Sequence, residues 1–528
     1  MKAMRSDQER YIISNLDKKT PQQLARELGI SERKINRFIR MRRLSPKPAL
    51  HTGIDDFLAV RFSEKQLLVF SALIIAFVTA LVFLPALSNN FVTWDDPEYV
   101  YENPLIRTFT PENIKNIFTS SFQGAYCPIT ILSYSLEYGL AGNTPFIYHF
   151  TNYILHIGVT LLTLIFIYRI SGNVFVAFFT ALFFGIHPVH VESVAWIAER
   201  KDVLYALFYM LSILAYQRYL SENKIGRYLL CLTYAVLSFF SKPMAITLPA
   251  VLFLMDYVHK RKLGWAMVAE KIPFFIIGAG VGMISYRFQV LSGVTKVGSD
   301  TLVRVYFLLK EIPFYLSKLL LPYPLVPVYK YYNVGPSHIP ELYFNAIVLL
   351  SIGVFVIFSA RRTRTVVFCA LFFLITASPV LKVIPVADTF AADRYMYIPS
   401  IGVFFLLSLA VKKYIFDRRY NASIRVVCTL VLSAWILLLS CRTIEQCGVW
   451  KNTETFFLHI LRHGPDIPTA NNNLGLYYLE REEYDKAIIY LERAIENNPA
   501  PVIAEMARSN LAEARSKKDW QRHGMPVE

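Results

Sequence analysis

Charged residues are scarce in this chain. Asp, Glu, Lys and Arg make up only 18% of its 528 residues, whereas 54% of the residues are hydrophobic. A chain with so little charge is too apolar for an ordinary soluble protein. The composition therefore argues against the soluble classes and favours a protein that lies in a membrane.

Motifs of nucleotide-driven and hydrolytic enzymes are also missing. The segment GAGVGM at 278–283 lies in an apolar run without a following Lys-Ser/Thr, so we interpret it as helix packing rather than a phosphate-binding loop. No G-x-S-x-G elbow and no C-x-x-C pair occurs. The six cysteines lack metal-ligand spacing, and Cys127 and Cys447 are the two that could pair outside the membrane. These absences argue against ATP-driven transport and classical hydrolase chemistry.

Long apolar runs are what the chain has instead. A helix needs roughly 20 apolar residues to cross a bilayer, and we count roughly eleven candidate spans. They lie near residues 67–87, 146–169, 173–187, 202–219, 227–240, 246–258, 272–286, 342–359, 365–381, 400–412 and 426–441. Stretch 302–322 contains four charged residues, so we interpret it as an interfacial or re-entrant helix. The sequence predicts an all-α polytopic membrane protein.

Basic residues mark one side of the membrane. They gather in the N-terminal arm and in four loops, at Arg218, Lys224, Arg227, Lys260, Arg261, Lys262, Arg361, Arg362, Arg364, Lys412, Lys413, Arg418 and Arg419. The positive-inside rule places these loops and the N-terminus in the cytoplasm. We expect the opposite side to hold segments 88–145, 187–202, 241–246, 287–341, 382–399 and 442–528. No cleavable signal peptide is expected, because about 60 polar residues precede the first apolar run.

Residues 1–50 predict a cytoplasmic helix-turn-helix-like module, followed by a linker at 51–66. In TPQQLARELGISERKINRFIR, Thr20 and Ser31 stand at the N-caps of two helices. The apolar positions are Leu24, Leu28, Ile35 and Phe38, and the second helix carries Arg33, Lys34, Arg37 and Arg40. DNA contact is one interpretation. The membrane tether favours an adaptor or a basic face on anionic lipid, so we expect no nucleic-acid partner.

After a membrane domain at 67–445, residues 450–528 predict a soluble helical segment. The stretch NNNLGLYYLEREEYDKAIIYLERAIENNP has the residue offsets of a tetratricopeptide repeat (TPR). The small residues Gly475 and Ala487 allow its two helices to approach closely, and Pro499 ends the second helix. One complete repeat buries too little surface to be stable alone. We therefore expect this segment to pack on the membrane domain or on a partner.

Paired carboxylates follow the first apolar run, in FVTWDDPEYVYENPLI at 91–106. Asp95 and Asp96 repel one another, which raises one pKa unless they share a cation. Hydrated or capping carboxylates would be an ordinary explanation. Their position beside the membrane, with Trp94 and Tyr99 nearby, favours a general base or a group that holds a metal ion.

Two further polar clusters fall on the same predicted side. In HPVHVESVAWIAERKD at 187–202, a helix from His190 would place Glu192, Trp196 and Glu199 on one face. Arg200 and Lys201 could bind a phosphate, while an internal salt-bridge network would explain the run Glu199 to Asp202. His187 and His190 are weak candidates for a metal site, because Pro188 breaks the spacing.

The third cluster is VADTFAADRYMYIPS at 386–400. The Arg394 guanidinium can hold an anion, with Asp393 orienting it and Tyr395 beside it. Lys242 adds a cation at the same level, unless it only reaches lipid headgroups. Charges at a membrane boundary are expensive, so three clusters that converge predict a site. A carboxylate would activate an acceptor hydroxyl, and the cations would stabilise the phosphate of a polyprenyl-phosphate sugar as it leaves.

Five stretches resemble the transmembrane and tetratricopeptide repeat-containing (TMTC) O-mannosyltransferases and their bacterial relatives. They are NNFVTWDDPEYVYENPLI, HPVHVESVAWIAERKDVL, SKPMAITLPAVLFLMDY, ADRYMYIPSIG and VWKNTETFF, in the family's order. The resemblance implies a GT-C glycosyltransferase with a polyprenyl-phosphate donor and with its repeats on the non-cytoplasmic side. It implies that the catalytic acidic motif of the first outer loop is Asp95 and Asp96, and that Glu192, Glu199 or Asp202 is the second acidic group.

Two departures separate this chain from the animal pattern. It has about one repeat rather than a long array, so a protein acceptor is less secure and lipid or glycan acceptors remain open. It also has the N-terminal module, which favours a bacterial inner-membrane protein with a periplasmic C-terminus. We predict transfer of a hexose, mannose by the resemblance, with no certain cofactor beyond a possible divalent cation. The alternatives are a transporter or flippase of lipid-linked glycans and a membrane-tethered regulator.

Overall fold

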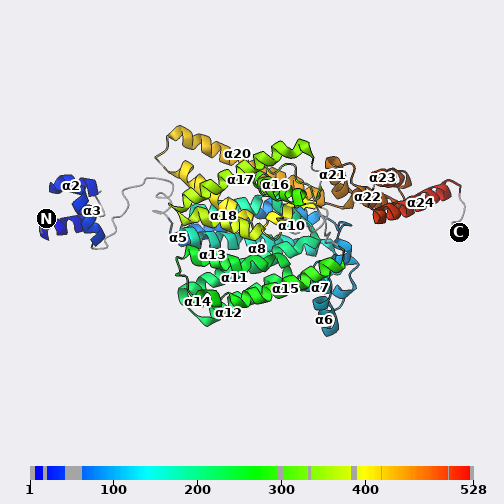
Figure 1. The fold of residues 1–528 in the computed structure, drawn as a ribbon, viewed down its shortest axis with the longest axis horizontal. Coiled ribbons are helices and arrows are strands. Elements are labelled where there is room, and N and C mark those ends of the chain that lie inside the picture. Colours follow the sequence, from blue (N-terminus) through cyan, green and yellow to red (C-terminus); the bar gives the residue numbers. More distant parts are fainter. Residues whose placement is uncertain are drawn as a thin grey trace.

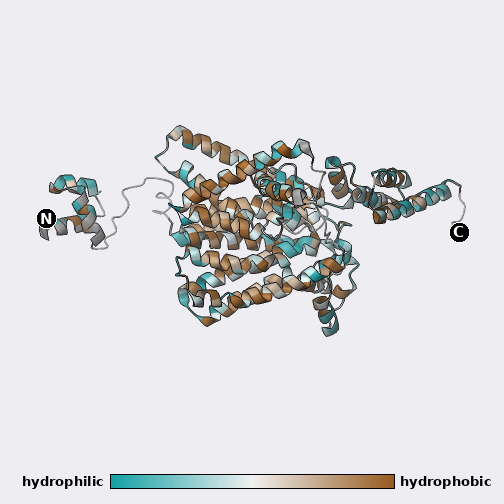
Figure 2. Ribbon diagram, in the orientation of Figure 1, coloured by the Kyte–Doolittle hydropathy of each residue, from teal (hydrophilic) through white to brown (hydrophobic). Residues whose placement is uncertain are grey.

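The structure is a computed structural model that describes residues 6–15, 21–41, 62–293, 301–330, 335–381, 389–417, 419–497 and 499–523. Figure 1 shows a central helical bundle with α1–α3 at one end of the long axis and α21–α24 at the other. The bundle is mostly hydrophobic, whereas both ends are largely hydrophilic (Figure 2). This distribution fits a membrane body between two water-exposed parts.

The helices are as follows. The N-terminal part contains α1 (Ser6–Asn15), α2 (Pro21–Leu28) and α3 (Glu32–Met41). The bundle contains α5 (Glu64–Phe83), α6 (Pro111–Thr119), α7 (Pro128–Ala141), α8 (Pro145–Ser171), α9 (Val174–Ile186), α10 (Val191–Ala195), α11 (Arg200–Glu222), α12 (Ile225–Ser241), α13 (Leu248–Val258), α14 (Trp265–Ala269), α15 (Ile272–Leu291), α16 (Thr301–Leu320), α17 (Ile339–Ala360), α18 (Arg364–Ala377), α19 (Ser400–Val411) and α20 (Ala422–Cys447). The C-terminal part contains α21 (Thr453–His463), α22 (Pro468–Glu480), α23 (Tyr484–Glu496) and α24 (Pro501–His523).

Short elements connect these helices near the site. The helical turns used below are η2 (Pro97–Tyr101), η4 (Pro188–His190), η5 (Ile197–Glu199), η6 (Pro243–Thr247), η8 (Asp393–Met396) and η10 (Gly448–Trp450). Strands β1 (Tyr329–Lys330) and β2 (Thr389–Ala391) pair antiparallel, with Tyr329 opposite Ala391. The bundle thus carries its irregular backbone between the long helices, where functional residues often lie.

Fewer helices qualify as membrane spans than the sequence predicts. Among the described residues, six are long and apolar enough: Glu64–Ser88, Pro145–Ser171, Ile197–Glu222, Trp265–Leu291, Ile339–Ala360 and Ala422–Trp450. A seventh results if Val174–Ile186 and Pro188–Ala195, which meet at 52°, form one broken span. The apolar helices Ile225–Ser241, Pro243–Val258 and Arg364–Ala377 are shorter than a full crossing. The chain is a multi-pass membrane protein, and the count of roughly eleven spans is not confirmed.

Local sequence explains how the bundle is built. Ser63 begins α5 with a capping box, accepting from the Gln66 N–H while the Gln66 side chain accepts from the Ser63 N–H. A Cβ atom at Gly402 of α19 would lie 2.6 Å from the Cys369 carbonyl oxygen of α18. Only a glycine therefore permits this close crossing of two helices.

The two ends of the chain have their own packing. Ile12, Leu24, Ile35 and Phe38 of α1–α3 form a small buried cluster, in agreement with the apolar positions of the predicted module. Thr20 lies outside the described residues, as do the side chains of Arg33, Arg37 and Arg40. In the C-terminal part, a Cβ at Gly475 of α22 would lie 2.6 Å from Leu491 Cγ of α23. The predicted close approach of these helices is present, while the repeat assignment stays a prediction.

Candidate active site

The two adjacent carboxylates of the first loop, which follows α5, have different surroundings. Asp96 is buried, and its Oδ2 and Oδ1 accept hydrogen bonds from the Val92 N–H (2.8 Å) and the Ala198 N–H (2.9 Å). Both oxygens are therefore used to join the first loop to the segment before α11. Asp95 is half-buried and lines a cavity of about 410 Å³.

This cavity collects residues from seven parts of the chain. Its charged lining residues are Asp95, Glu199, Lys201, Lys242 and Arg394. Its apolar lining includes Met244, Ile246, Gly282, Pro379 and Val380, from η6, α15 and the turn after α18. One part of the lining thus suits a phosphate and another an apolar chain, so the cavity can hold an amphiphilic ligand.

Glu199 organises the cations of the cavity. Its carboxylate lies 2.8 Å from Lys201 Nζ, 2.6 Å from Lys242 Nζ and 3.5 Å from Arg394 Nε. A buried carboxylate with three cationic partners is a poor proton acceptor, because its negative charge is already compensated. The geometry favours a positioning role for Glu199, whereas the sequence had suggested a catalytic one.

Further carboxylates fix the cations from behind. Glu192 forms an ion pair with the Arg394 guanidinium and accepts the Arg394 backbone N–H at 2.9 Å. Asp202 accepts from Lys242 Nζ at 2.7 Å and from Ser193 Oγ at 3.1 Å. Neither of these carboxylates is among the lining residues of the cavity. Their contacts hold Arg394 and Lys242 in place beside the cavity.

Three sequence predictions about this region are wrong. The stretch from His190 is not one helix, because the backbone at Trp196 is extended (φ −87°, ψ 119°) between α10 and η5. Arg200 is buried away from the cavity, where it pairs with Glu137 and donates to Asn152 Oδ1 at 2.8 Å. Asp393 accepts from the Tyr329 hydroxyl at 3.0 Å, and Glu192 rather than Asp393 orients Arg394.

The candidate metal ligands and the candidate disulfide are also not supported. His187 Nε2 lies 3.1 Å from the Leu319 carbonyl, and His190 bonds the Phe184 carbonyl and Ser400 Oγ. Across the described ranges, no group of three or more His, Cys, Asp and Glu side chains is placed to hold a metal ion. Cys127 and Cys447 are both free thiols. The two histidines therefore act as buried hydrogen-bonding groups.

The causes that shift the pKa also differ between Asp95 and Asp96. Partial burial raises the pKa of Asp95, with Lys201 and Arg394 opposing and Glu199 reinforcing the shift. Burial raises the pKa of Asp96 to about 7, against the opposing effect of its two N–H donors. Asp95 is thus a carboxylate with a raised proton affinity that faces the cavity, as a general base requires.

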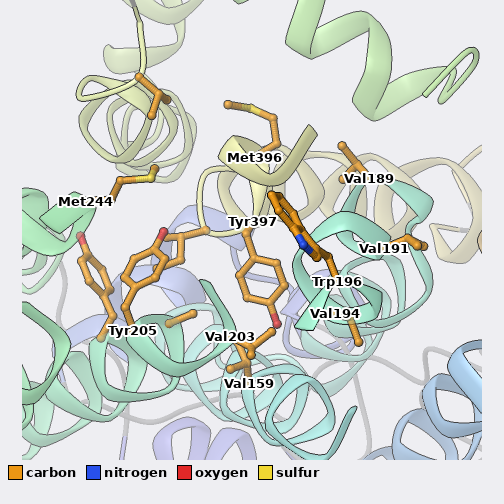
Figure 3. Close-up of a cluster of buried hydrophobic side chains, with 14 of the residues drawn as sticks. Val159, Val189, Val191, Val194, Trp196, Val203, Tyr205, Met244, Met396 and Tyr397 are labelled. Atoms are coloured by element: carbon orange, nitrogen blue, oxygen red, sulfur yellow. The ribbon is translucent and has the colours of Figure 1, made fainter. Parts of the chain in front are cut away.

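Sequence reasoning missed an aromatic support for the first loop. Trp196 stacks on Trp450 of η10 with ring centroids 5.1 Å apart, and Trp94 lies 5.8 Å from Phe456 of α21. Figure 3 shows Trp196 in a buried cluster with Tyr205, Tyr397 and Met244. The stretch VWKNTETFF contains Trp450 and Phe456, so the resemblance marked this segment without indicating its contacts.

Polar contacts reinforce this support. The Thr93 N–H donates to Thr453 Oγ1 at 3.1 Å, and the Asn90 N–H donates to the Lys451 carbonyl at 2.9 Å. Asn89 Nδ2 donates to the Cys447 carbonyl at 3.1 Å. The residues just before Asp95 are therefore held by the end of α20 and the start of α21.

Two buried hydrogen-bond donors of the cavity have no partner within the described part of the chain. They are Trp196 Nε1 and Ser285 Oγ, and each residue is only 3% exposed. Buried polar groups are normally satisfied, so an unpaired one at a cavity suggests a ligand or water that bonds to it.

Comparison with known proteins identifies relatives of this chain. Mouse protein O-mannosyl-transferase TMTC3 is 23% identical over 486 residues, covering 82% of this chain and 52% of TMTC3. Mouse TMTC4 is 24% identical over 501 residues, covering 79% of this chain and 65% of TMTC4. Mouse TMTC1 is 37% identical over 171 residues, covering 30% of this chain and 18% of TMTC1. The resemblance is confirmed: curated homologues over most of the chain are TMTC O-mannosyltransferases.

This chain is shorter than the relatives that it matches. The chain spans about half the length of TMTC3. No family model matches it. A solved structure of ArnT from Cupriavidus metallidurans bound to undecaprenyl phosphate aligns with a TM-score of 0.36 and 13% identity, covering 86% of this chain and 79% of ArnT.

Proposed function

We propose that this chain is an integral-membrane glycosyltransferase of the GT-C type. It transfers a hexose, mannose by analogy with its homologues, from a polyprenyl-phosphate donor to a hydroxyl acceptor. The observation that carries this proposal is the cavity in which Asp95 faces Lys201, Lys242 and Arg394 beside an apolar wall. The names of the TMTC homologues support the reaction class.

The lining of the cavity suits each part of such a donor. Lys242 and Arg394 are the groups for the phosphate, since both are cations held in fixed positions. Met244, Ile246 and Val380 suit the polyprenyl chain. The unpaired donors Trp196 Nε1 and Ser285 Oγ suit sugar hydroxyls. A free sugar nucleotide would leave the apolar wall exposed to water, which disfavours it.

Asp95 carries the chemistry in this proposal. Its carboxylate takes the proton of the acceptor hydroxyl as the acceptor oxygen attacks the anomeric carbon of the sugar. The bond between that carbon and the phosphate oxygen breaks, and polyprenyl phosphate leaves with the electron pair. Lys201, Lys242 and Arg394 stabilise the negative charge that develops on the phosphate, since they are fixed before the reaction starts.

The remaining predicted site residues have supporting roles. Asp96 closes the first loop onto the Ala198 N–H, and Glu199 positions the cations. Tyr395 lines the cavity, with the Arg394 guanidinium carbon 5.0 Å from its ring centroid. The other predicted residues, Glu192, Arg200, Asp202 and Asp393, lie outside the lining. Glu192 and Asp202 hold the lining residues Arg394 and Lys242. Arg200 and Asp393 instead bond to Glu137 and Tyr329, which do not line the cavity.

The topology and the acceptor belong to the same proposal. The N-terminal module (1–50) lies in the cytoplasm, and the segment 450–528 lies with the cavity on the other side, in a bacterial inner membrane. Two observations support this arrangement: α1–α3 and α21 lie at opposite ends of the bundle (Figure 1), and the first loop rests on α21. An acceptor Ser or Thr hydroxyl of a protein would approach on that side.

A transfer assay tests the function. Purified full-length protein is incubated with labelled polyprenyl-phosphate mannose or glucose, a mixture of peptide and glycan acceptors, and either Mg²⁺ or a chelator. The proposal predicts label in an acceptor and release of one polyprenyl phosphate for each hexose transferred. Movement of intact donor across vesicles without any covalent transfer would instead show a flippase and refute the proposal.

A further inference from the structure

A second cavity of about 410 Å³ lies at the other end of α11. Its polar lining residues include Gln217, Ser221, Asn223 and His259, from the end of α11 and the loop after α13. A helix rises about 1.5 Å per residue, so Gln217 lies roughly 24 Å along the axis from Lys201 in the catalytic cavity. The two cavities therefore lie near opposite surfaces of the membrane body.

Gln217 brings a side-chain amide without hydrogen-bond partners to this second cavity. The residue is only 6% exposed, and neither its Nε2 nor its Oε1 has a partner in the described part of the molecule. A buried amide without partners is unfavourable, and it offers one acceptor and two N–H donors to a ligand. A phosphodiester with adjacent hydroxyl groups can satisfy both kinds of group.

The rim of the second cavity is basic. Lys260 and Lys262 flank the lining residue Arg261, are exposed, and form no ion pair with another described residue. Arg261 itself is held by Glu270, with Nη2 donating to Oε1 at 2.7 Å. The two lysines are therefore the cations that remain available to an anionic ligand.

Exposed apolar residues place this rim at the membrane surface. Leu263 is 89% exposed and Trp265 is 85% exposed, next to the basic loop. Tryptophan at the end of a membrane body sits at the level of the lipid headgroups. In Figure 1, α14, which begins at Trp265, lies at the end of the bundle toward α1–α3 and away from α21. Leu220 adds an apolar part to the cavity lining.

We propose that this second cavity binds the headgroup of an anionic glycerophospholipid of the leaflet on the basic side. The Gln217 amide bonds the phosphodiester or glycerol oxygens, and Lys260 and Lys262 pair with the phosphate charge. Leu263 and Trp265 contact the upper acyl chains. This lipid site is separate from the donor cavity and does not depend on the proposed reaction.

The test uses the full-length protein in an uncharged detergent. Lipid retention is measured by native mass spectrometry with phosphatidylglycerol, with phosphatidylcholine, and with phosphatidylglycerol in the presence of glycerol phosphate. We expect retention of phosphatidylglycerol over phosphatidylcholine, with little competition by glycerol phosphate. K260A/K262A removes two cations at the membrane surface and should weaken retention of phosphatidylglycerol roughly tenfold or more.

Two further variants complete the test. Gln217→Leu keeps the size of the side chain while removing its hydrogen bonds, and it should also weaken retention. K412A/K413A removes the same charge from a different basic loop and should retain phosphatidylglycerol as the wild type does. The lysine variants change only residues near the surface, so they remain informative if Gln217→Leu does not fold.

Three results would overturn the lipid site. The first is equal retention by wild type and K260A/K262A. The second is equal retention of phosphatidylcholine and phosphatidylglycerol. The third is full competition by glycerol phosphate, which would show a site for soluble phosphates instead.

Discussion

Asp95→Asn is the substitution that probes the chemistry with the least change in shape. It removes the negative charge of a half-buried side chain that lines the cavity, while Asn has the same size. Among the described lining residues, Glu199 is the only other carboxylate, and its three cations make it a poor replacement base. We therefore expect the full loss of general-base catalysis, about 10²–10⁴-fold in kcat.

Asp96→Asn is the matched control, because it makes the same chemical change one residue away. Asp96 uses both oxygens to accept backbone N–H groups, so the new amide NH₂ would face an N–H donor. One buried donor is then left unpaired, at about 1–3 kcal/mol of stability. We expect Asp96→Asn to lower Tm clearly and Asp95→Asn to leave Tm near the wild-type value.

The assay combines transfer of labelled hexose with thermal unfolding in the same detergent. A loss of about 10²-fold or more corresponds to at least about 2.7 kcal/mol of transition-state stabilisation. Full transfer by Asp95→Asn would refute the base assignment. Unfolding of Asp95→Asn at the same lowered temperature as Asp96→Asn would show that Asp95 is structural.

Three other outcomes follow from the same geometry. The pKa of Asp95 lies above its usual value of 3.8, and a general base works only when it is deprotonated. We therefore expect kcat/KM to fall as the pH decreases through the pKa of Asp95. A kcat/KM that stays constant down to pH 4 while the protein remains folded would contradict the base assignment. Arg394→Lys removes the guanidinium group that Glu192 holds and should raise the donor KM about tenfold. The KM is measured with polyprenyl phosphate as a competing product. An unchanged KM would exclude Arg394 as a phosphate ligand. Trp450→Ala removes the ring that stacks on Trp196 and should lower kcat about tenfold. Trp520→Ala, on exposed α24, serves as its control, and equal kcat in both variants would show that the stack does not position the first loop.

The apolar runs of the sequence predicted helices well and spans less well. Run length alone does not show where a helix breaks, and Pro188 follows α9 at a 52° bend that divides one apolar region into two. Runs such as 225–241 and 364–377 form helices too short to cross alone. Whether such helices cross the membrane or lie within it depends on how they pack against neighbouring helices, and hydropathy alone does not describe that packing.

The candidate site could be predicted as a set of segments but not residue by residue. Charge at the ends of apolar runs is rare enough to mark 95–96, 187–202, 242 and 393–395, and the structure brings all four parts together. Adjacent residues within one segment have different roles because they contact different partners. Arg200 pairs with Glu137, 63 positions earlier in the sequence, while Lys201 lines the cavity. Nothing in the local spacing distinguishes these two adjacent cations.

The most direct test of the central claim is a structure of the full chain with bound polyprenyl phosphate. The account predicts the phosphate within about 4 Å of Lys242 Nζ and the Arg394 guanidinium, with the first isoprenoid units along Met244, Ile246 and Val380. Asp95 should face the open side of that phosphate, where the acceptor approaches. A phosphate bound outside this cavity, with Asp95 remote from it, would contradict the account.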